Sequence, residues 1–143
     1  MPVGIIHWAI PGVLAHGERP GFPLRSVPPE AVEDWFKEVK RQGIRSVINL
    51  LVEDEMAVYY RRLGRPLLDY YAEAGLRVRE VAHADDGVPV SSRILLDRVR
   101  VAFEHLPKPV LIHCSAGAER SQQAVALLCK EWKTRTKKRR KEA

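Results

Sequence analysis

The sequence has little of what metal centres, cofactor sites and membrane spans require. Its five histidines are scattered, and no cluster of His, Cys and carboxylate residues has the spacing of metal ligands. It contains neither a Walker-type phosphate loop nor a dinucleotide-binding glycine pattern. The apolar N-terminus lacks a basic start, is broken at Pro11 and Gly12, and is too short to cross a bilayer. These absences favour a cytoplasmic protein that works without a metal or cofactor.

Cysteine is scarce, and we expect both cysteines to be reduced. Cys114 closes a predicted strand, whereas Cys129 belongs to a predicted helix beyond Arg120. The helical rise of ~1.5 Å per residue separates Cys129 from Arg120 by roughly 12 Å along the axis. That separation exceeds the reach of a disulfide. Two free thiols agree with a reducing compartment.

Charge is concentrated at one end of the chain. Residues 130–143 hold eight Lys or Arg and two Glu, so they account for the whole net charge of +6 of this 143-residue chain. Such a run binds phosphate backbones or an acidic surface, or it is a solvated helix end whose cations suit the helix dipole. The length allows one hydrophobic core. We therefore predict one domain over residues 1–130 and a basic helix end or tail over 131–143, with at most a weak nucleic-acid or acidic-surface contact.

Predicted strands and helices alternate along the chain. Apolar periodicity and turn residues predict two short strands joined at Pro11-Gly12, further strands near 45–51, 76–82 and 108–113, and helices near 30–42, 63–74, 92–106 and from 121 onward. The acidic stretch after residue 51 is expected to be less regular. This order predicts an α/β fold, a mostly parallel sheet flanked by helices. Ligands of such sheets bind beyond the carboxyl ends of the strands.

One short stretch, "HCSAGAERS" at 113 to 121, occupies that position after the most buried strand. Small residues let the backbone N–H groups of a loop turn inward around an anion. Arg120, just inside the following helix, can grip two oxygens of a tetrahedral oxyanion. The Cys114 thiol, next to these donors and the helix dipole, is expected to ionise readily. The stretch therefore predicts a phosphate-binding loop with a nucleophile, built from Ser115, Ala116, Gly117, Ala118, Glu119 and Arg120.

The same stretch carries a resemblance to a known family. His113, Cys114, Arg120 and Ser121 match the signature of the protein tyrosine phosphatase superfamily. "HADDGVP" at 83 to 89 resembles its mobile acid loop, and "HWAIPGVLAHGERP" and "GIRSVINLL" are similar to the first strands of the small dual-specificity and archaeal phosphatases. The likeness covers roughly residues 7–130. It implies a cysteine-dependent phosphatase fold acting on phosphorylated proteins or peptides.

The resemblance also implies a role for each site residue. Cys114 would attack the phosphorus atom of phosphotyrosine, and of phosphoserine or phosphothreonine if the specificity is dual, to form a cysteinyl-phosphate that water hydrolyses. Ser121 would help the thiolate leave. Arg120 and the loop amides would stabilise the phosphate oxygens. His113 would orient the loop by hydrogen bonds, although a purely structural histidine is an open alternative.

Two neighbouring aspartates compete for the role of general acid. Aligning Gly87, Val88 and Pro89 with the family loop puts Asp85 at the acid position and Asp86 at its variable neighbour. Asp85 is therefore the predicted acid. Both aspartates also suit a turn before a glycine.

Two positions depart from the family pattern. Glu119 stands where relatives often have glycine, and Gln122 stands where a glycine commonly follows the serine. A carboxylate beside the loop repels a phosphate dianion unless it points outward, so we expect Glu119 to weaken phosphate binding or narrow the range of substrates. A catalytically weak phosphate-binding module for phosphorylated protein or RNA is the main alternative to an active phosphatase. A rhodanese-type sulfur transferase is a weaker one.

Overall fold

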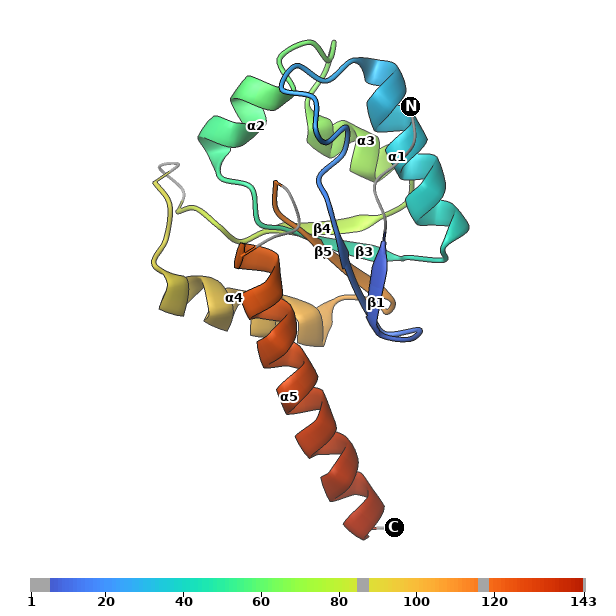
Figure 1. Cartoon of the computed structure of the whole chain (residues 1–143), viewed down its shortest axis with the longest axis vertical. Coiled ribbons are helices and arrows are strands. Elements are labelled where there is room, and N and C mark those ends of the chain that lie inside the picture. Colours follow the sequence, from blue (N-terminus) through green and yellow to red (C-terminus); the bar gives the residue numbers. More distant parts are fainter. Residues whose placement is uncertain (1–5, 85–87, 116–118, 143) are drawn as a thin grey trace.

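The fold was obtained from a computed structural model, which describes residues 6–84, 88–115 and 119–142. Five strands form one sheet: β1 (His7–Ile10), β2 (Leu14–Gly17), β3 (Ser46–Asn49), β4 (Arg77–Glu80) and β5 (Val110–His113). The helices are α1 (Pro29–Arg41), α2 (Glu53–Tyr59), α3 (Leu67–Glu73), α4 (Ser92–His105) and α5 (Glu119–Glu142). The predicted α/β fold with helices on both faces of a mostly parallel sheet is confirmed (Figure 1).

The strand order β1-β2-β5-β3-β4 places the strand before Cys114 at the centre of the sheet. β5 pairs in parallel with β2 on one side and with β3 on the other, and β3 pairs in parallel with the edge strand β4. β1 and β2 form the only antiparallel pair of named strands in the described sheet. All four residues of β5 are buried, whereas those of β4 alternate between exposed and half-buried. Both observations agree with the sequence, in which apolar and polar residues alternate along β4 but not along β5.

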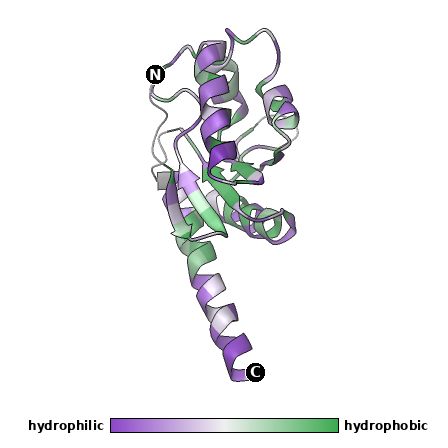
Figure 2. Ribbon diagram, turned by 90° about the vertical axis from the view of Figure 1, so that its right-hand side faces the viewer, coloured by the Kyte–Doolittle hydropathy of each residue, from purple (hydrophilic) through white to green (hydrophobic). Residues whose placement is uncertain are grey.

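Two apolar layers cover the two faces of the sheet. On one face Val47 and Leu111 pack with Trp35 and Phe36 of α1 and Tyr71 of α3. On the other face the core comes from α4, α5 and the opposite side of the strands, and it is formed by Ile48, Val99, Phe103, Ile112, Ala124 and Leu128. Figure 2 shows the apolar strands enclosed by helices whose polar sides face outward.

The structure corrects three predictions about local structure. The acidic stretch after Leu51 forms the regular helix α2, whose residues include no fully buried one and so leave no apolar stripe to detect. α3 begins only at Leu67, because Pro66 at its N-cap has no backbone N–H and would interrupt a helix that began at residue 63. α5 begins at Glu119, two residues before the predicted start at Ser121, so Arg120 lies within its first turn.

Candidate active site

The candidate site lies where three parallel strands end side by side. The register pairs His113 of β5 with Gly17 of β2 and with Asn49 of β3, so the segments after these residues leave the sheet at one edge. A hydrogen bond of 2.8 Å from the Leu50 amide to the His113 carbonyl extends the pairing of β3 with β5 by one residue. The residues that follow these strands therefore meet at one place, as the topology of a parallel sheet requires.

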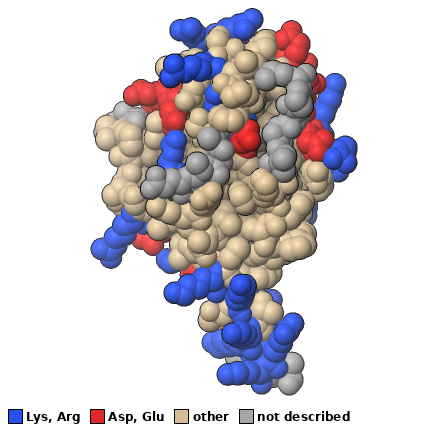
Figure 3. All heavy atoms as spheres, in the orientation of Figure 1, with Lys and Arg blue, Asp and Glu red and all other residues tan. Residues whose placement is uncertain are grey.

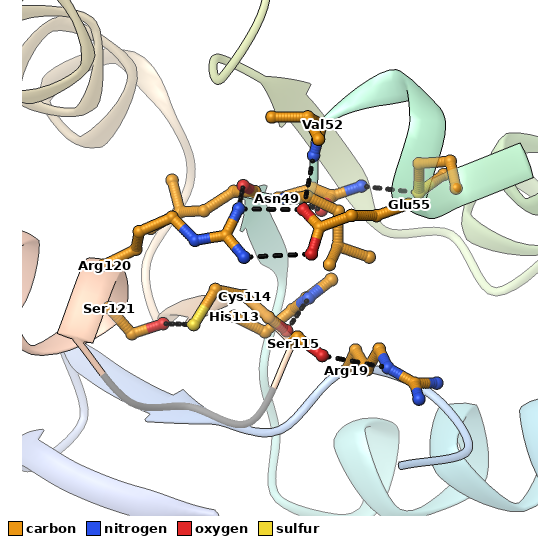
Figure 4. Close-up of polar contacts among 12 residues, drawn as sticks. Arg19, Asn49, Val52, Glu55, His113, Cys114, Ser115, Arg120 and Ser121 are labelled. Atoms are coloured by element: carbon orange, nitrogen blue, oxygen red, sulfur yellow. Dashed lines mark hydrogen bonds and ion pairs between the residues drawn. The ribbon is translucent and has the colours of Figure 1, made fainter. Parts of the chain in front are cut away.

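Cys114 and Ser121 form the buried floor of this site. Cys114 is 3% exposed and Ser121 is fully buried. The Ser121 hydroxyl donates a hydrogen bond to the sulfur over 3.0 Å (Figure 4). A hydroxyl at this distance stabilises negative charge on sulfur. The structure thus brings together the predicted nucleophile and the residue expected to assist its departure.

Arg120 points across the carboxyl edge of the sheet toward α2. Its Nη1 and Nη2 groups donate to the two carboxylate oxygens of Glu55 over 2.8 and 3.0 Å, and Nη1 also donates to the Leu50 carbonyl over 3.0 Å (Figure 4). This bidentate pair uses the end of the guanidinium fork. A guanidinium has five N–H donors, and these contacts use three of them. The Nε hydrogen and the second Nη2 hydrogen, which lie on one side of the guanidinium, are left for another acceptor. That side is the one that can grip two oxygens of a phosphate group.

The ion pair shifts the protonation of both partners. Burial raises the pKa of Glu55, but the Arg120 hydrogen bonds, the Val52 amide and the charges of Arg120 and Arg19 outweigh it, so the net pKa is lowered. The Glu55 hydrogen bond is the main cause of the raised pKa of Arg120. The pair is therefore fully charged at neutral pH.

Glu55 is a site residue that the sequence analysis missed. The Val52 amide donates to its carboxylate over 3.0 Å, and Asn49 shapes the preceding turn by accepting the Leu51 amide over 2.9 Å. The available signal was the run of acidic residues directly after the buried strand β3. Because the carboxyl ends of β3 and β5 share one edge, that run had to lie near the loop that follows Cys114.

His113 is buried beneath the site, as predicted. Burial lowers its pKa to about 4, so the ring is neutral at physiological pH. Nδ1 lies 3.3 Å from the Cys114 carbonyl, which can only accept, and therefore carries the proton. Nε2 then accepts from the Tyr71 hydroxyl over 2.7 Å. Trp35 packs edge-on against the ring. These contacts fix the ring orientation; the loop-orienting role and a purely structural role both agree with them.

Several predicted site residues lie outside the described residues. They are Asp85 and Asp86 of the acid loop and Ala116, Gly117 and Ala118 of the phosphate loop, and the side chain of Glu119 is likewise not described. Ser115 is described, and it contacts Arg19, whose backbone amide donates to the Ser115 carbonyl over 3.1 Å. The parts of the acid loop that flank the tip are joined by a bridge between His83 and Pro89.

No protein-family model and no curated protein matches the sequence. Solved structures match over most of the chain. Kinase associated phosphatase, with its catalytic-site cysteine replaced by serine, gives a TM-score of 0.64 at 24% identity and covers 91% of this chain and 75% of that one. The core catalytic domain of the PP-IP phosphatase SIW14 from S. cerevisiae gives 0.58 at 17% identity, with 91% and 68% covered.

The chain has the fold of the protein tyrosine phosphatase superfamily. A further neighbour, a DUF442 protein from Shewanella putrefaciens, gives a TM-score of 0.58 at 20% identity and covers 87% of this chain and 70% of that one. Within the described part of this phosphatase fold, no group of three or more His, Cys, Asp or Glu is arranged to hold a metal ion. Among the same residues, no helix has both the length and the apolar character of a membrane span.

Proposed function

We propose that the protein is a cysteine-dependent phosphatase that hydrolyses phosphotyrosine, with phosphoserine and phosphothreonine as further substrates. The observation that carries the proposal is the contact of the Ser121 hydroxyl with the Cys114 sulfur, next to the Arg120 guanidinium. Thiol, hydroxyl and guanidinium are all placed by the end of β5 and the first turn of α5. A buried structural cysteine has no need of this arrangement.

The reaction has two balanced steps. The Cys114 thiolate attacks phosphorus, the bond to the leaving oxygen breaks, and Asp85 gives that oxygen a proton. Water then attacks the cysteinyl-phosphate, Asp85 takes a proton from the water, and inorganic phosphate leaves. The Ser121 hydroxyl stabilises the thiolate as the sulfur departs. The Nε side of Arg120 and the loop amides hold the equatorial oxygens while charge redistributes.

Hydrolysis of 4-nitrophenyl phosphate tests the proposal. We expect turnover by the natural chain, a phosphoryl group trapped on Cys114 by acid quench, and loss of both in Cys114→Ser. Cys129→Ser is the matched control, because Cys129 is the second free thiol and packs at the periphery of the α4–α5 core. Its rate should equal that of the natural chain. An unaltered rate in Cys114→Ser contradicts the proposal.

Substrate class requires a separate comparison. Phosphotyrosine and phosphoserine peptides should be assayed beside PP-IP, the substrate class named for the neighbour SIW14.

The alternative function is a phosphate-binding module with weak catalysis. Glu119 favours this alternative, because a carboxylate beside the loop repels a phosphate dianion. If it does so here, Glu119→Gly should lower KM or raise kcat/KM. Binding of a phosphopeptide without turnover would establish this alternative.

A further inference from the structure

Arg19 is a second buried cation next to the candidate site. It follows β2 by two residues, and the residue is only 2% exposed. Among the described side chains no carboxylate lies within ion-pair distance of it. Burial of an ion costs several kcal/mol unless the protein supplies compensating contacts. The contacts that stabilise this buried guanidinium therefore indicate its role.

A built turn holds the guanidinium in place. Pro20 and Gly21 form the centre of a turn closed by a 3.1 Å hydrogen bond from the Phe22 amide to the Arg19 carbonyl. Gly21 has a φ of 80°, which favours glycine, and a Cβ there would lie 2.3 Å from a methyl of Val27. The turn brings the Leu24 carbonyl back to accept from Arg19 Nη2 over 2.6 Å.

An aromatic ring completes the seat of the guanidinium. The Arg19 Cζ lies 3.8 Å from the centre of the Tyr59 ring, at the end of α2. A guanidinium stacked on an aromatic face is stabilised by the ring quadrupole without being neutralised. The guanidinium group thus keeps its positive charge, is held in one orientation and is shielded from water.

Two contacts connect Arg19 to the start of the phosphate loop. The Arg19 amide donates to the Ser115 carbonyl over 3.1 Å, and Nε faces the Ser115 hydroxyl at 3.4 Å (Figure 4). The field of the cation reaches the site as well. Burial is the main cause of the lowered pKa of His113, and the Arg19 charge lowers that pKa further. The same charge helps to lower the pKa of Glu55, where burial acts in the opposite sense.

We propose that Arg19 is a positioning residue of the phosphatase site, which holds Ser115 at the start of the phosphate loop and adds a buried positive charge beside the oxyanion pocket. The inference rests on the proposed function and extends it. Ser115 follows the nucleophile directly, so a displaced Ser115 moves the first loop amide relative to the sulfur. A fixed cation nearby favours the bound anion over the empty pocket.

Binding of inorganic tungstate, a tetrahedral oxyanion, tests the inference without requiring turnover. In Arg19→Met we expect the Kd for tungstate to rise about tenfold, which corresponds to ~1.4 kcal/mol, and kcat for 4-nitrophenyl phosphate to fall by a similar factor. Arg19→Lys restores the charge but not the fork, so it should recover most of the tungstate affinity while kcat stays low. The matched control Arg25→Met removes an exposed cation from the same segment and should change neither quantity.

The outcomes separate the inference from the proposed function. If the natural chain binds no tungstate and hydrolyses no aryl phosphate, the proposed function fails and this inference fails with it. If the natural chain does both and a folded Arg19→Met matches it, the inference alone is overturned. Should Arg19→Met not fold, Ser115→Ala decides, because it removes only the hydroxyl that Nε faces. A Ser115→Ala variant with natural kcat and natural tungstate affinity overturns the inference.

Discussion

At the scale of single residues, Arg120 is oriented by contacts within the protein. Its terminal nitrogens bind Glu55 and the Leu50 carbonyl, so its orientation is set before any phosphate arrives. An arginine that is already ordered loses less side-chain entropy on binding a ligand. Glu55 is half-buried and anchored by the Val52 amide, which makes it a rigid partner.

We predict that Glu55→Gln lowers kcat/KM for 4-nitrophenyl phosphate by about 10- to 100-fold, the effect of losing one charge-assisted contact of ~1.5–3 kcal/mol. The amide keeps the shape of the side chain, but only its oxygen can accept an N–H of Arg120, because its NH2 group is a donor. Glu53→Gln is the control, since Glu53 is exposed on the same helix. Equal rates for the two variants would show that the ion pair does not orient Arg120.

The same pair makes stability depend on pH. The folded-state pKa of Glu55 is lowered against its ordinary value of 4.5. The pair's contribution is therefore fully present above pH 4.5 and is lost as the pH falls through the lowered value. We expect the Tm difference between the natural chain and Glu55→Gln to be largest at pH 7 and to shrink below pH 4.5. A difference that stays constant down to pH 3 would contradict the assignment.

At the scale of elements, the order of strands and helices was predictable and the role of α2 was not. α1, β3, α4 and β5 carry apolar residues at helical spacing or in buried runs, which periodicity detects. α2 buries no residue completely, so its seven residues show no such pattern. Its contribution to the site is the pairing of Glu55 with Arg120, 65 residues later. A contact of that range is specified by strand order and not by any local pattern. The contact between Ser121 and Cys114 joins residues that are close in sequence, and the signature at 113 to 121 indicated it.

The predicted acid loop is an element whose flanks are joined by backbone hydrogen bonds. The Ala84 amide donates to the Val88 carbonyl over 2.9 Å, and the Val90 amide donates to the Ala82 carbonyl over 3.0 Å. Asp85 and Asp86 themselves lie outside the described residues. We predict that Asp85→Asn slows hydrolysis of alkyl phosphates by about 10²–10⁴ and removes the basic limb of the pH profile. Asp86→Asn should leave both unchanged. The reverse result would assign the acid to Asp86.

At the scale of the whole molecule, α5 carries Arg120 at one end and the excess positive charge at the other. The helix projects beyond the α/β body, and its far end gathers Lys and Arg side chains (Figures 1 and 3). Apolar core contacts of α5 extend only to Trp132. The basic end is therefore separate from the edge of the sheet where Cys114 lies.

We predict that the double substitution Lys137→Glu, Lys138→Glu leaves kcat/KM for 4-nitrophenyl phosphate within about twofold, because opposite ends of the helix are screened from each other beyond a Debye length of ~8 Å. The same variant should elute from heparin at lower salt than the natural chain. A marked fall in kcat/KM would show that the basic end acts on the catalytic edge. An unchanged salt concentration at elution would indicate that the basic end of α5 is a solvated surface that binds no polyanion.

The 24 residues of α5 form one unbroken helix. A rod of this kind is stiff, so a second protein domain joined to it without a break in the helix would be held at a fixed angle to the body instead of tumbling on a flexible tether. Rotation of that attached domain would be conveyed along the rod toward Arg120 and Ser121. The far end of α5 is thus connected, through one continuous helix, to the first turn that carries both residues.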